Sequence, residues 1–409
     1  MYDVEKIRKQ FPMLNNKMMQ GHKLVYLDNA STTFKPQCVI DAMNYYYTDQ
    51  TANSHRGDYD LMNNNDTTII ETRKVVAHFI NSESNEVVFT SGDTESINLL
   101  ANAFAKRILK KGDVIVVSES EHASNLLPWY DVAHETGAII KFVPLNEKGQ
   151  ITLDNLNKIM SNEVKIVALA HTSNVLGYTI DIKEFAKVVH SYGAYFAVDG
   201  AQSVPHIKVD FKESDIDFLS ISGHKMCAPT GIGCFIGKYE LLQKMSTYKV
   251  GGGMNVSFEK DTSMVPYDAP MKFEAGTLNI SGIYGLKAAV EFLESIGIDE
   301  IHKHDQELCE YAISEMEKID DIIIYNKDAK NGIITFNRKG VFAQDEATLF
   351  NSKGIAIRSG QHCAKILKDY LGCVATCRMS TYLYTSKEDI DAFLDVLRNG
   401  GDILDAYFN

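Results

Sequence analysis

DFLSISGHKMCAPTGIGCFIG, residues 217–237, is the stretch of sequence that decides the fold. An apolar run opens it and a second apolar run closes it, which predicts two short buried strands. Between them stands Lys225, an ammonium at the point where a buried strand gives way to a loop. Its neighbours, SGH before it and APTGIG after it, are mostly small and let a bulky ligand approach. A lone lysine at a strand end is usually a solvated charge, so its meaning depends on the rest of the chain.

Short β-rich runs alternate with amphipathic helical patterns over residues 23–237. In TESINLLANAFAKRIL (94–109) and DIKEFAKVVHSYG (181–193), apolar residues recur at intervals of three and four. This rhythm predicts an α/β fold, a mostly parallel sheet of the seven-stranded type with helices on both faces. The predicted strands are KLVYLD (23–28), EVVFT (86–90), DVIVVS (113–118), AIIKFVP (138–144), KIVALAHT (165–172), YFAVDG (195–200), DFLSIS (217–222) and GIGCFIG (231–237).

The rhythm breaks at residues 251–276, where a GGG, two prolines and few apolar runs predict a long functional loop. A long helical pattern, residues 280–297, follows. The order helix, strand, strand, helix, strand, strand, helix then ends in SKEDIDAFLDVLRNGGDIL and predicts a smaller α+β domain. We therefore expect a large domain over residues 21–294 and a small domain made of residues 1–20 and 295–409.

Composition excludes several classes of protein. Of the 409 residues 45% are hydrophobic and 23% are charged, as in ordinary globular proteins. The net charge of -13 and the pI of about 5.4 argue against nucleic acid as a partner. No segment approaches the roughly 20 apolar residues of a membrane span, and the N-terminus does not resemble a signal or transit peptide. Seven scattered cysteines without a secreted framework predict a cytoplasmic protein.

Polar residues gather where predicted strands end, which is where open α/β sheets bind ligands. TSGDTESIN places Gly92, Asp93 and Thr94 between a strand and a helix, where free backbone N–H groups can hold a phosphate. The alternative is a simple helix cap by Asp93 or Thr94. Asp199 ends the apolar strand YFAVD, and its carboxylate there needs a partner, either a protonated ring nitrogen or a capped backbone.

Asp199 and Lys225 together form the pair that pyridoxal phosphate chemistry requires. The amine forms a Schiff base with the cofactor, and the acid keeps the pyridine nitrogen protonated. SGHK also fits the S-x-x-K motif of penicillin-binding enzymes, but the chain contains no S-D-N and no K-T-G. The pair therefore favours pyridoxal phosphate.

The small domain supplies a candidate nucleophile. GIAIRSGQHCAKIL places Cys363 just past a strand, with Arg358 and His362 nearby, and a cysteine next to cations can act as a thiolate. The alternative is a small buried hydrophobe. Arg378 is a candidate clamp for a substrate carboxylate or one half of a structural salt bridge. The cysteines of this segment contain no C-x-x-C pair, so we expect no metal site.

Eight motifs bring a family resemblance over essentially the whole chain. In order they are YLDNAST, HRG, EHASNLLPW, HTSNVLG, VDGAQS, SGHK, FEAGT and IRSGQHCA. The chain resembles class V, fold type I pyridoxal phosphate enzymes and specifically the SufS-type, or group II, cysteine desulfurases. The pair SGHK and RSGQHCA is the most specific and differs from the longer cysteine loop of the NifS and IscS type.

The resemblance implies a function. A homodimer would convert L-cysteine to L-alanine and a persulfide on Cys363, then pass the sulfur to a SufE-like or SufU-like acceptor and the Suf scaffold for iron-sulfur cluster assembly. Alternatives are a selenocysteine lyase or another lyase or aminotransferase on the same fold, and a degenerate non-catalytic partner.

The resemblance also implies roles for individual residues. Catalysis falls on Lys225, Cys363 and His122. Substrate binding falls on Asn174, Arg358 and Arg378. The cofactor contacts are Lys225 as the internal aldimine, Asp199 at the pyridinium, His122 on the ring, Gln202 at the phenolic oxygen, Thr94, Ser222 and His224 at the phosphate, and Thr277 at the phosphate of the neighbouring subunit.

Three departures from the family pattern bear on the acceptor and the cofactor, besides the minor ones in EHASN and at Leu278. Gln361 stands where relatives commonly have a histidine, and Gln344 replaces a histidine that some relatives use when a zinc-containing SufU-type acceptor docks. Both changes favour a SufE-like acceptor or a simple thiol. Asp93 replaces a small hydroxyl residue beside the phosphate turn, where an anion would repel phosphate unless it points away.

Overall fold

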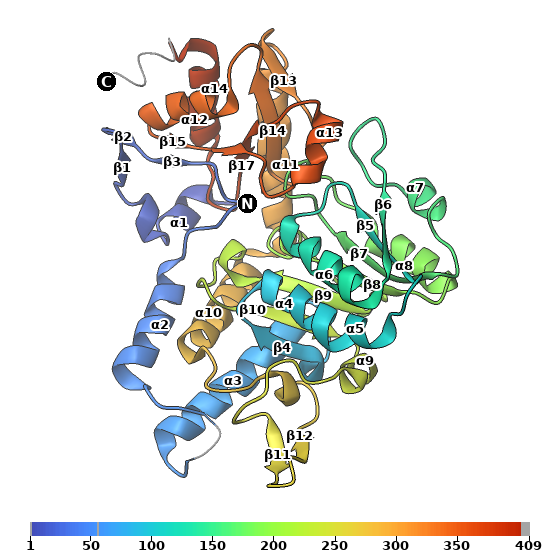
Figure 1. Cartoon of the computed structure of the whole chain (residues 1–409). Coiled ribbons are helices and arrows are strands. Elements are labelled where there is room, and N and C mark those ends of the chain that lie inside the picture. Colours follow the sequence, from blue (N-terminus) through green and yellow to red (C-terminus); the bar gives the residue numbers. More distant parts are fainter. Residues whose placement is uncertain (1, 55–56, 402–409) are drawn as a thin grey trace.

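A seven-stranded sheet organises the larger part of the chain in the computed structural model, which describes residues 2–54 and 57–401 (Figure 1). His55 and Arg56 of the HRG motif, and the end of the predicted C-terminal pattern from residue 402, lie outside the described residues. β10 runs antiparallel to both its neighbours, and the other pairs are parallel. The strand order is β4 (Val87–Thr90), β10 (Gly233–Gly237), β9 (Phe218–Ser222), β8 (Tyr195–Asp199), β7 (Val164–Ala170), β5 (Val114–Ser118) and β6 (Ile139–Val143).

Seven of the eight predicted strands form this sheet, which confirms the predicted α/β class. The eighth, KLVYLD, shortens to β3 (Val25–Tyr26) and pairs in parallel with β15 (Ile355–Ala356), outside the large sheet. Its apolar residues are also buried there, so the composition of the run could not distinguish the two locations.

Helices cover both faces of the sheet because its strands are apolar on both sides. In β5, Val114 and Val116 pack on one face while Ile115 and Val117 pack on the other. The first face is covered by α2 (Gln37–Asp49), α3 (Asp60–Phe79), α8 (Ile182–Ser191) and α10 (Ile280–Ile296). The second face is covered by α4 (Asp93–Leu100), a π-helical turn (Ala101–Ala105), α5 (Lys106–Ile108), α6 (Leu127–Thr136) and α9 (Tyr239–Lys244). The short α7 (Leu153–Asn157) precedes β7.

A second, antiparallel sheet lies above the first in Figure 1. Its strand order is β13 (Ile322–Ile324), β14 (Ile333–Arg338), β17 (Thr376–Ser380) and β16 (Arg358–Gly360). The helices around it are α11 (Ile298–Met316), α12 (Ala343–Ser352), α13 (Lys368–Leu371) and α14 (Lys387–Asn399). They bury a separate core that includes Phe336, Phe350 and Phe393. This α+β arrangement is the one predicted after residue 295.

The N-terminal helix α1 (Val4–Arg8) lies against the C-terminal part of the chain. Arg8 Nη1 donates to Asp389 Oδ2 at 2.5 Å and to the carbonyl of Tyr384 at 2.6 Å. A small hairpin of β1 (Met18–Met19) and β2 (His22–Lys23) follows. The domain boundaries at residues 20 and 294 stay a prediction.

The predicted loop at 251–276 contains a hairpin, β11 (Asn255–Phe258) and β12 (Met264–Pro266), which projects from the molecule (Figure 1). The turn is closed by Ser263, whose N–H donates to Asp261 Oδ1 at 2.9 Å. Our prediction missed these strands because their apolar residues are few; Val256 and Phe258 are exposed. Over the described residues, no helix is both long and apolar enough to cross a membrane.

Candidate active site

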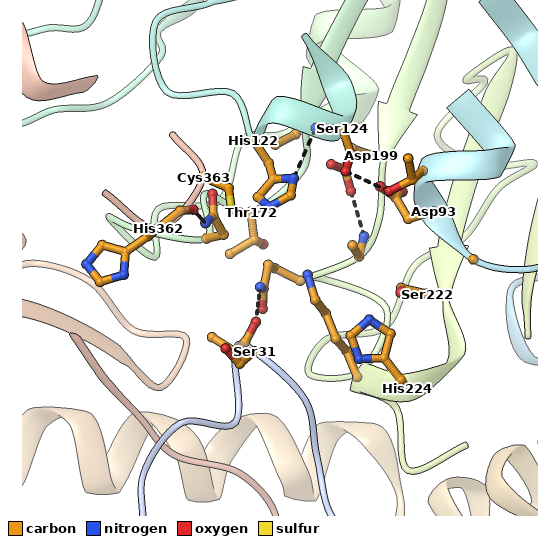
Figure 2. A pocket seen from close by; sticks show the side chains of 18 of the residues that line it. Ser31, Asp93, His122, Ser124, Thr172, Asp199, Ser222, His224, His362 and Cys363 are labelled. Atoms are coloured by element: carbon orange, nitrogen blue, oxygen red, sulfur yellow. Dashed lines mark hydrogen bonds between the residues drawn. The ribbon is translucent and has the colours of Figure 1, made fainter. Parts of the chain in front are cut away.

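A cavity of about 290 Å³ opens at the carboxyl ends of the sheet strands, against the segment after β15 (Figure 2). It brings together eleven of the twelve predicted site residues. These are Thr94, His122, Asn174, Asp199, Gln202, Ser222, His224, Lys225, Arg358, Cys363 and Arg378. Thr277 is not among the lining residues and lies exposed before α10.

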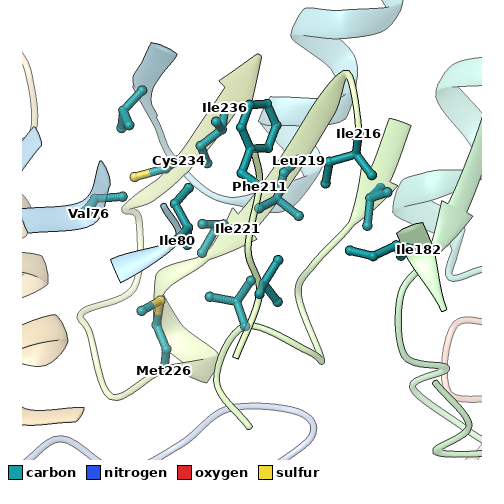
Figure 3. Packing of buried hydrophobic residues seen from close by; sticks show 14 of the residues in the cluster. Val76, Ile80, Ile182, Phe211, Ile216, Leu219, Ile221, Met226, Cys234 and Ile236 are labelled. Atoms are coloured by element: carbon teal, nitrogen blue, oxygen red, sulfur yellow. The ribbon is translucent and has the colours of Figure 1, made fainter. Parts of the chain in front are cut away.

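Lys225 ends a short 3-10 helix (Gly223–Lys225) directly after β9. The turn needs glycine at 223, because a Cβ there would come within 2.5 Å of the Ile232 carbonyl oxygen. Beneath the turn, Ile221 and Met226 belong to the apolar cluster of the first face (Figure 3). Burial lowers the pKa of Lys225, although Asp199 and Asp93 act in the opposite direction. The cavity therefore holds a lysine whose amine is easier to deprotonate than usual.

His122 follows β5, and its neighbour in the chain, Glu121, is held by three hydrogen-bond donors. Glu121 accepts from Ser118 Oγ at 2.5 Å, Asn125 Nδ2 at 2.7 Å and the Ala170 N–H at 3.0 Å. His122 Nδ1 then accepts from the backbone N–H of Ser124 at 3.1 Å, so the neutral ring carries its proton on Nε2. Burial lowers the pKa of His122, and the Lys225 charge adds to the effect. The imidazole is therefore neutral with an N–H available.

Asp199 ends β8 with its side chain buried in the cavity wall. Its Oδ1 accepts from the Ala201 N–H at 2.9 Å. The next turn holds Gln202, whose Nε2 donates to the Ala30 carbonyl at 2.8 Å. Figure 2 shows Asp93 beside Asp199, and Ser220 Oγ donates to Asp93 Oδ1 at 2.5 Å. The Asp93 carboxyl is thus directed toward these two side chains.

The predicted phosphate turn joins β4 to α4. Gly92 has a φ of 146°, in the region that favours glycine, and α4 then presents the free N–H groups of its first turn. Thr94 Oγ1 and Ser124 Oγ lie 2.7 Å apart. Across the turn lie Ser222 and His224, and burial lowers the pKa of His224 to about 4 with help from the Lys225 charge. Neutral donors and helix N–H groups make this end of the cavity suitable for an anion.

The segment that carries Cys363 is tied to the large sheet by two backbone oxygens. The carbonyl of Cys363 accepts from the Ala123 N–H at 2.8 Å, and that of His362 accepts from Asn174 Nδ2 at 2.8 Å. Cys363 and His362 both have positive φ, 58° and 50°. The turn leaves Cys363 exposed at the cavity, while the ring of His362 points away from it (Figure 2).

Two arginines line the same side of the cavity. Arg378 is buried; its Nη1 donates to the Asn174 carbonyl at 2.7 Å and its Nη2 lies 3.3 Å from Asp28 Oδ1. Its Nε is buried without a partner. Arg358 hydrogen-bonds to Ser31 and is less buried. An unpaired buried N–H on a charged group is costly, so this corner is suited to bind a carboxylate.

Comparisons with known proteins agree with this geometry. The aminotransferase class-V family matches residues 25–393. A probable cysteine desulfurase of Halalkalibacterium halodurans is 42% identical over 391 residues, 95% of this chain and 96% of that protein. The chain belongs to the class-V aminotransferase family and, within it, to the cysteine desulfurases. A probable cysteine desulfurase of Staphylococcus aureus strain Mu50 is also 42% identical, over 97% of this chain and 96% of its own length.

Solved structures support the same assignment. The crystal structure of the cysteine desulfurase CsdA from Escherichia coli is 35% identical, with a TM-score of 0.91 and 98% of both chains covered. The cysteine desulfurase from Thermococcus onnurineus NA1 is 34% identical, with the same TM-score and 96% of both chains covered. The predicted class-V, fold type I family of cysteine desulfurases is thereby confirmed, and this cysteine desulfurase is a pyridoxal phosphate enzyme.

The cavity of this cysteine desulfurase fits pyridoxal phosphate. A deprotonatable lysine, a buried carboxylate, an imidazole and an anion-binding helix terminus face one space. Among the described residues, no group of three or more histidine, cysteine or acidic side chains could hold a metal ion.

Sequence reasoning missed several residues that shape the site. Ser31, Ser124 and Thr172 line the cavity, and Asp28 pairs with both arginines. Glu121 lies beneath His122, where burial raises its pKa to about 7. A buried acid beside a predicted catalytic histidine was a usable signal for Glu121, since such a carboxyl needs partners. Asp28 lies in the YLDNAST motif, but its pairing could not be predicted from the motif because both arginines lie more than 300 residues away.

Proposed function

We propose that this enzyme is a SufS-type cysteine desulfurase that converts L-cysteine to L-alanine and leaves a persulfide on Cys363. The observation that carries the proposal is the location of Cys363. Its thiol is exposed on the cavity that also holds Lys225 and His122, and its backbone is pinned there by Ala123. A nucleophile held on the wall of a lysine-containing cavity is what sulfur transfer from a bound substrate requires.

The roles of the cofactor-binding residues are those that the family resemblance implies, and the location of these residues on one cavity supports them. Lys225 would link to the cofactor, Asp199 would contact its ring nitrogen, and His122 would cover the ring. Gln202 would contact the phenolic oxygen. The phosphate would be held by the first turn of α4, with Thr94, Ser222 and His224. When bound, pyridoxal phosphate supplies an aldehyde for the substrate amine and an electron sink for the substrate carbon.

The chain's own residues account for the other requirements of the reaction. Arg378 and Arg358 hold the substrate carboxylate, with Asn174 fixing the guanidinium of Arg378. The amine of Lys225, with its lowered pKa, takes the α-proton. The Cys363 thiolate then attacks the substrate sulfur; the S–S bond forms, the Cβ–S bond breaks and its electron pair stays with carbon. Protonation of that carbon fragment gives alanine.

The persulfide would pass to an acceptor protein and on to iron-sulfur cluster assembly in the cytoplasm. Exposure of Cys363 supports transfer to an outside thiol. Gln361 and Gln344 are both exposed on the same small domain and offer no imidazole to a zinc site. We therefore infer a SufE-like acceptor or a simple thiol rather than a SufU-like one.

A homodimer would complete the site. Thr277 is exposed and is not among the residues that line its own cavity. The nearby hairpin exposes Val256, Phe258 and Val265. Exposed apolar residues gathered on one projection mark an interaction surface. A second copy covering them would bring Thr277 toward its phosphate turn.

The deciding experiment supplies L-cysteine and a reducing thiol to the cofactor-loaded enzyme and measures alanine and sulfide together. We expect equal amounts of both products, and loss of both in Cys363→Ser. Cys373→Ser is the matched control and should keep wild-type rates, because that thiol lies outside the cavity beside Tyr325. Desulfurase activity that survives Cys363→Ser, or no product from the loaded wild type, would contradict the proposal.

A further inference from the structure

Asp93 stands at the first position of α4, yet its carboxyl is turned toward the base of the cavity. Its Oδ1 accepts from Ser220 Oγ at 2.5 Å, and the side chain contacts Asp199 (Figure 2). Asp93 is 8% exposed and Asp199 is 6% exposed. Two buried carboxyl groups in contact cannot both be ionised at low cost, because they repel each other and both side chains are largely removed from solvent. One of the two must hold a proton.

The surroundings decide which one. Asp199 accepts a backbone hydrogen bond from Ala201, which favours its anionic form. Burial and the neighbouring charge of Asp199 raise the pKa of Asp93 well above its ordinary value, although Ser220 and Lys225 act in the opposite direction. The proton therefore resides on Asp93.

We propose that Asp93 is a positioning residue, a neutral carboxylic acid whose O–H donates to the Asp199 carboxylate. The pair then carries one negative charge, located on Asp199, and the phosphate turn meets no anion from its own first residue. The inference rests on the proposed role of Asp199 at the ring nitrogen of the cofactor. It deepens that role, since Asp199 is oriented from one side by Ala201 and from the other by Asp93.

Infrared spectra of the holoenzyme test the protonation directly. Asp93→Asn is the matched variant, because an amide keeps a donor toward Asp199 and an oxygen toward Ser220 but never ionises. We expect the wild-type minus Asp93→Asn difference spectrum at pH 7 to contain a protonated-carboxyl C=O band, which is separate from the partly protonated Glu121 common to both proteins, and this band should persist in Ser220→Ala. In Asp199→Asn the band should shift, because its acceptor changes from carboxylate to amide. A wild-type spectrum without the band, or a band unmoved by Asp199→Asn, would overturn the proposal.

The pH dependence of melting gives a second readout on the cofactor-free full chain. A raised folded pKa gives stability that is complete below the ordinary carboxyl pKa and is lost as pH rises toward the folded value. The melting temperature of Asp93→Asn minus that of wild type should therefore increase from pH 5 to pH 8. The underlying unfolding constants diverge by up to about tenfold per pH unit. A difference independent of pH would contradict a neutral Asp93.

Glu95 provides the control on the same helix. Burial alone would raise the pKa of Glu95, but hydrogen bonds from Lys249 and Ser91 outweigh it and lower that pKa. As pH rises out of the acidic range, the melting temperature of Glu95→Gln should therefore fall relative to that of wild type, whereas the melting temperature of Asp93→Asn should rise relative to wild type. If the two melting-temperature differences change with pH in the same direction, the result would count against the proposal.

Cofactor affinity is the third readout. With Asp93 neutral, wild type and Asp93→Asn should bind pyridoxal phosphate at pH 7 within about twofold of each other; an ionised Asp93 predicts binding about tenfold tighter in the variant. The infrared and melting measurements use no L-cysteine. An inactive chain would thus refute the proposed desulfurase reaction while leaving the Asp93 result readable.

Discussion

Single side chains set the charge balance of the site, and each depends on neighbours from distant parts of the chain. Burial lowers the pKa of Lys225, the charge of Asp199 raises it and the charge of Arg378 lowers it. His122 is kept neutral by burial and by Lys225. The cavity thus combines a deprotonatable amine with a neutral N–H donor, which suits proton transfer near neutral pH.

Arg378→Lys tests the proposed clamp at the residue scale. Lysine keeps the charge but cannot bridge the Asn174 carbonyl, Asp28 and a substrate carboxylate at once. We expect KM for L-cysteine to rise about tenfold or more, with a smaller change in kcat, because a charge-assisted hydrogen bond is lost. Steady-state kinetics measure both constants. Arg398→Lys, on the surface of α14, is the control and should match wild type; an unchanged KM in Arg378→Lys would remove the clamp from the proposal.

At the scale of elements, buried parallel strands are readable from sequence because both faces are apolar. The run DVIVVS predicts β5 for that reason, and helix starts such as that of α10 are marked by a capping side chain, here Asn279, which accepts from Gly282. Pairing partners are not readable in this way. KLVYLD forms β3 beside β15 because a pairing partner 330 residues away in the sequence lies there. In the same way, Glu121 is held by a hydrogen bond from the N–H of Ala170, which the sequence around Glu121 does not predict.

The loop from 251 to 276 depends on a buried ion pair that holds its C-terminal end. Arg73 donates from Nη1 and Nη2 to Glu274, each at 2.8 Å, and the Phe89 N–H donates to Glu274 Oε1 at 2.8 Å. The Arg73 guanidinium also lies 4.5 Å from the centre of the Phe89 ring. This anchor fixes the loop three residues before Thr277.

Glu274→Gln should therefore destabilise the protein by about 3 kcal/mol, because it leaves the Arg73 charge buried and unpaired. Thermal unfolding measures the effect. The exposed pair of Lys183 and Glu213, also 2.8 Å apart, is the control, and Glu213→Gln should cost less than about 1 kcal/mol. If Glu274→Gln and Glu213→Gln have the same melting temperature, the loop is not held by the pair of Arg73 and Glu274.

At the scale of the whole molecule, the site is assembled from residues of both sheets. Ala123 and Asn174 hold the Cys363 segment from the large sheet, while Arg378 reaches the same cavity from β17. Motif order along the chain was enough to predict eleven residues of one cavity. Thr277 is not among the residues that line this cavity, and its proposed role therefore depends on the proposed second copy.

Mixed dimers test that role. Thr277→Ala should bind pyridoxal phosphate more weakly, and Cys363→Ser should be inactive. At limiting cofactor, a dimer made of two copies of either variant should therefore release little or no alanine. If Thr277 serves the neighbouring subunit, a dimer containing one copy of each variant has one site with both native residues, and activity returns when the two are co-expressed. If Thr277 serves its own subunit, every site in the mixed dimer carries a defect and no activity returns. Alanine release from tagged, purified mixed dimers distinguishes the two outcomes.

A Phe258→Asp change on the exposed hairpin should abolish the recovery of activity in mixed dimers, because a charge on that apolar surface disfavours pairing of the two copies.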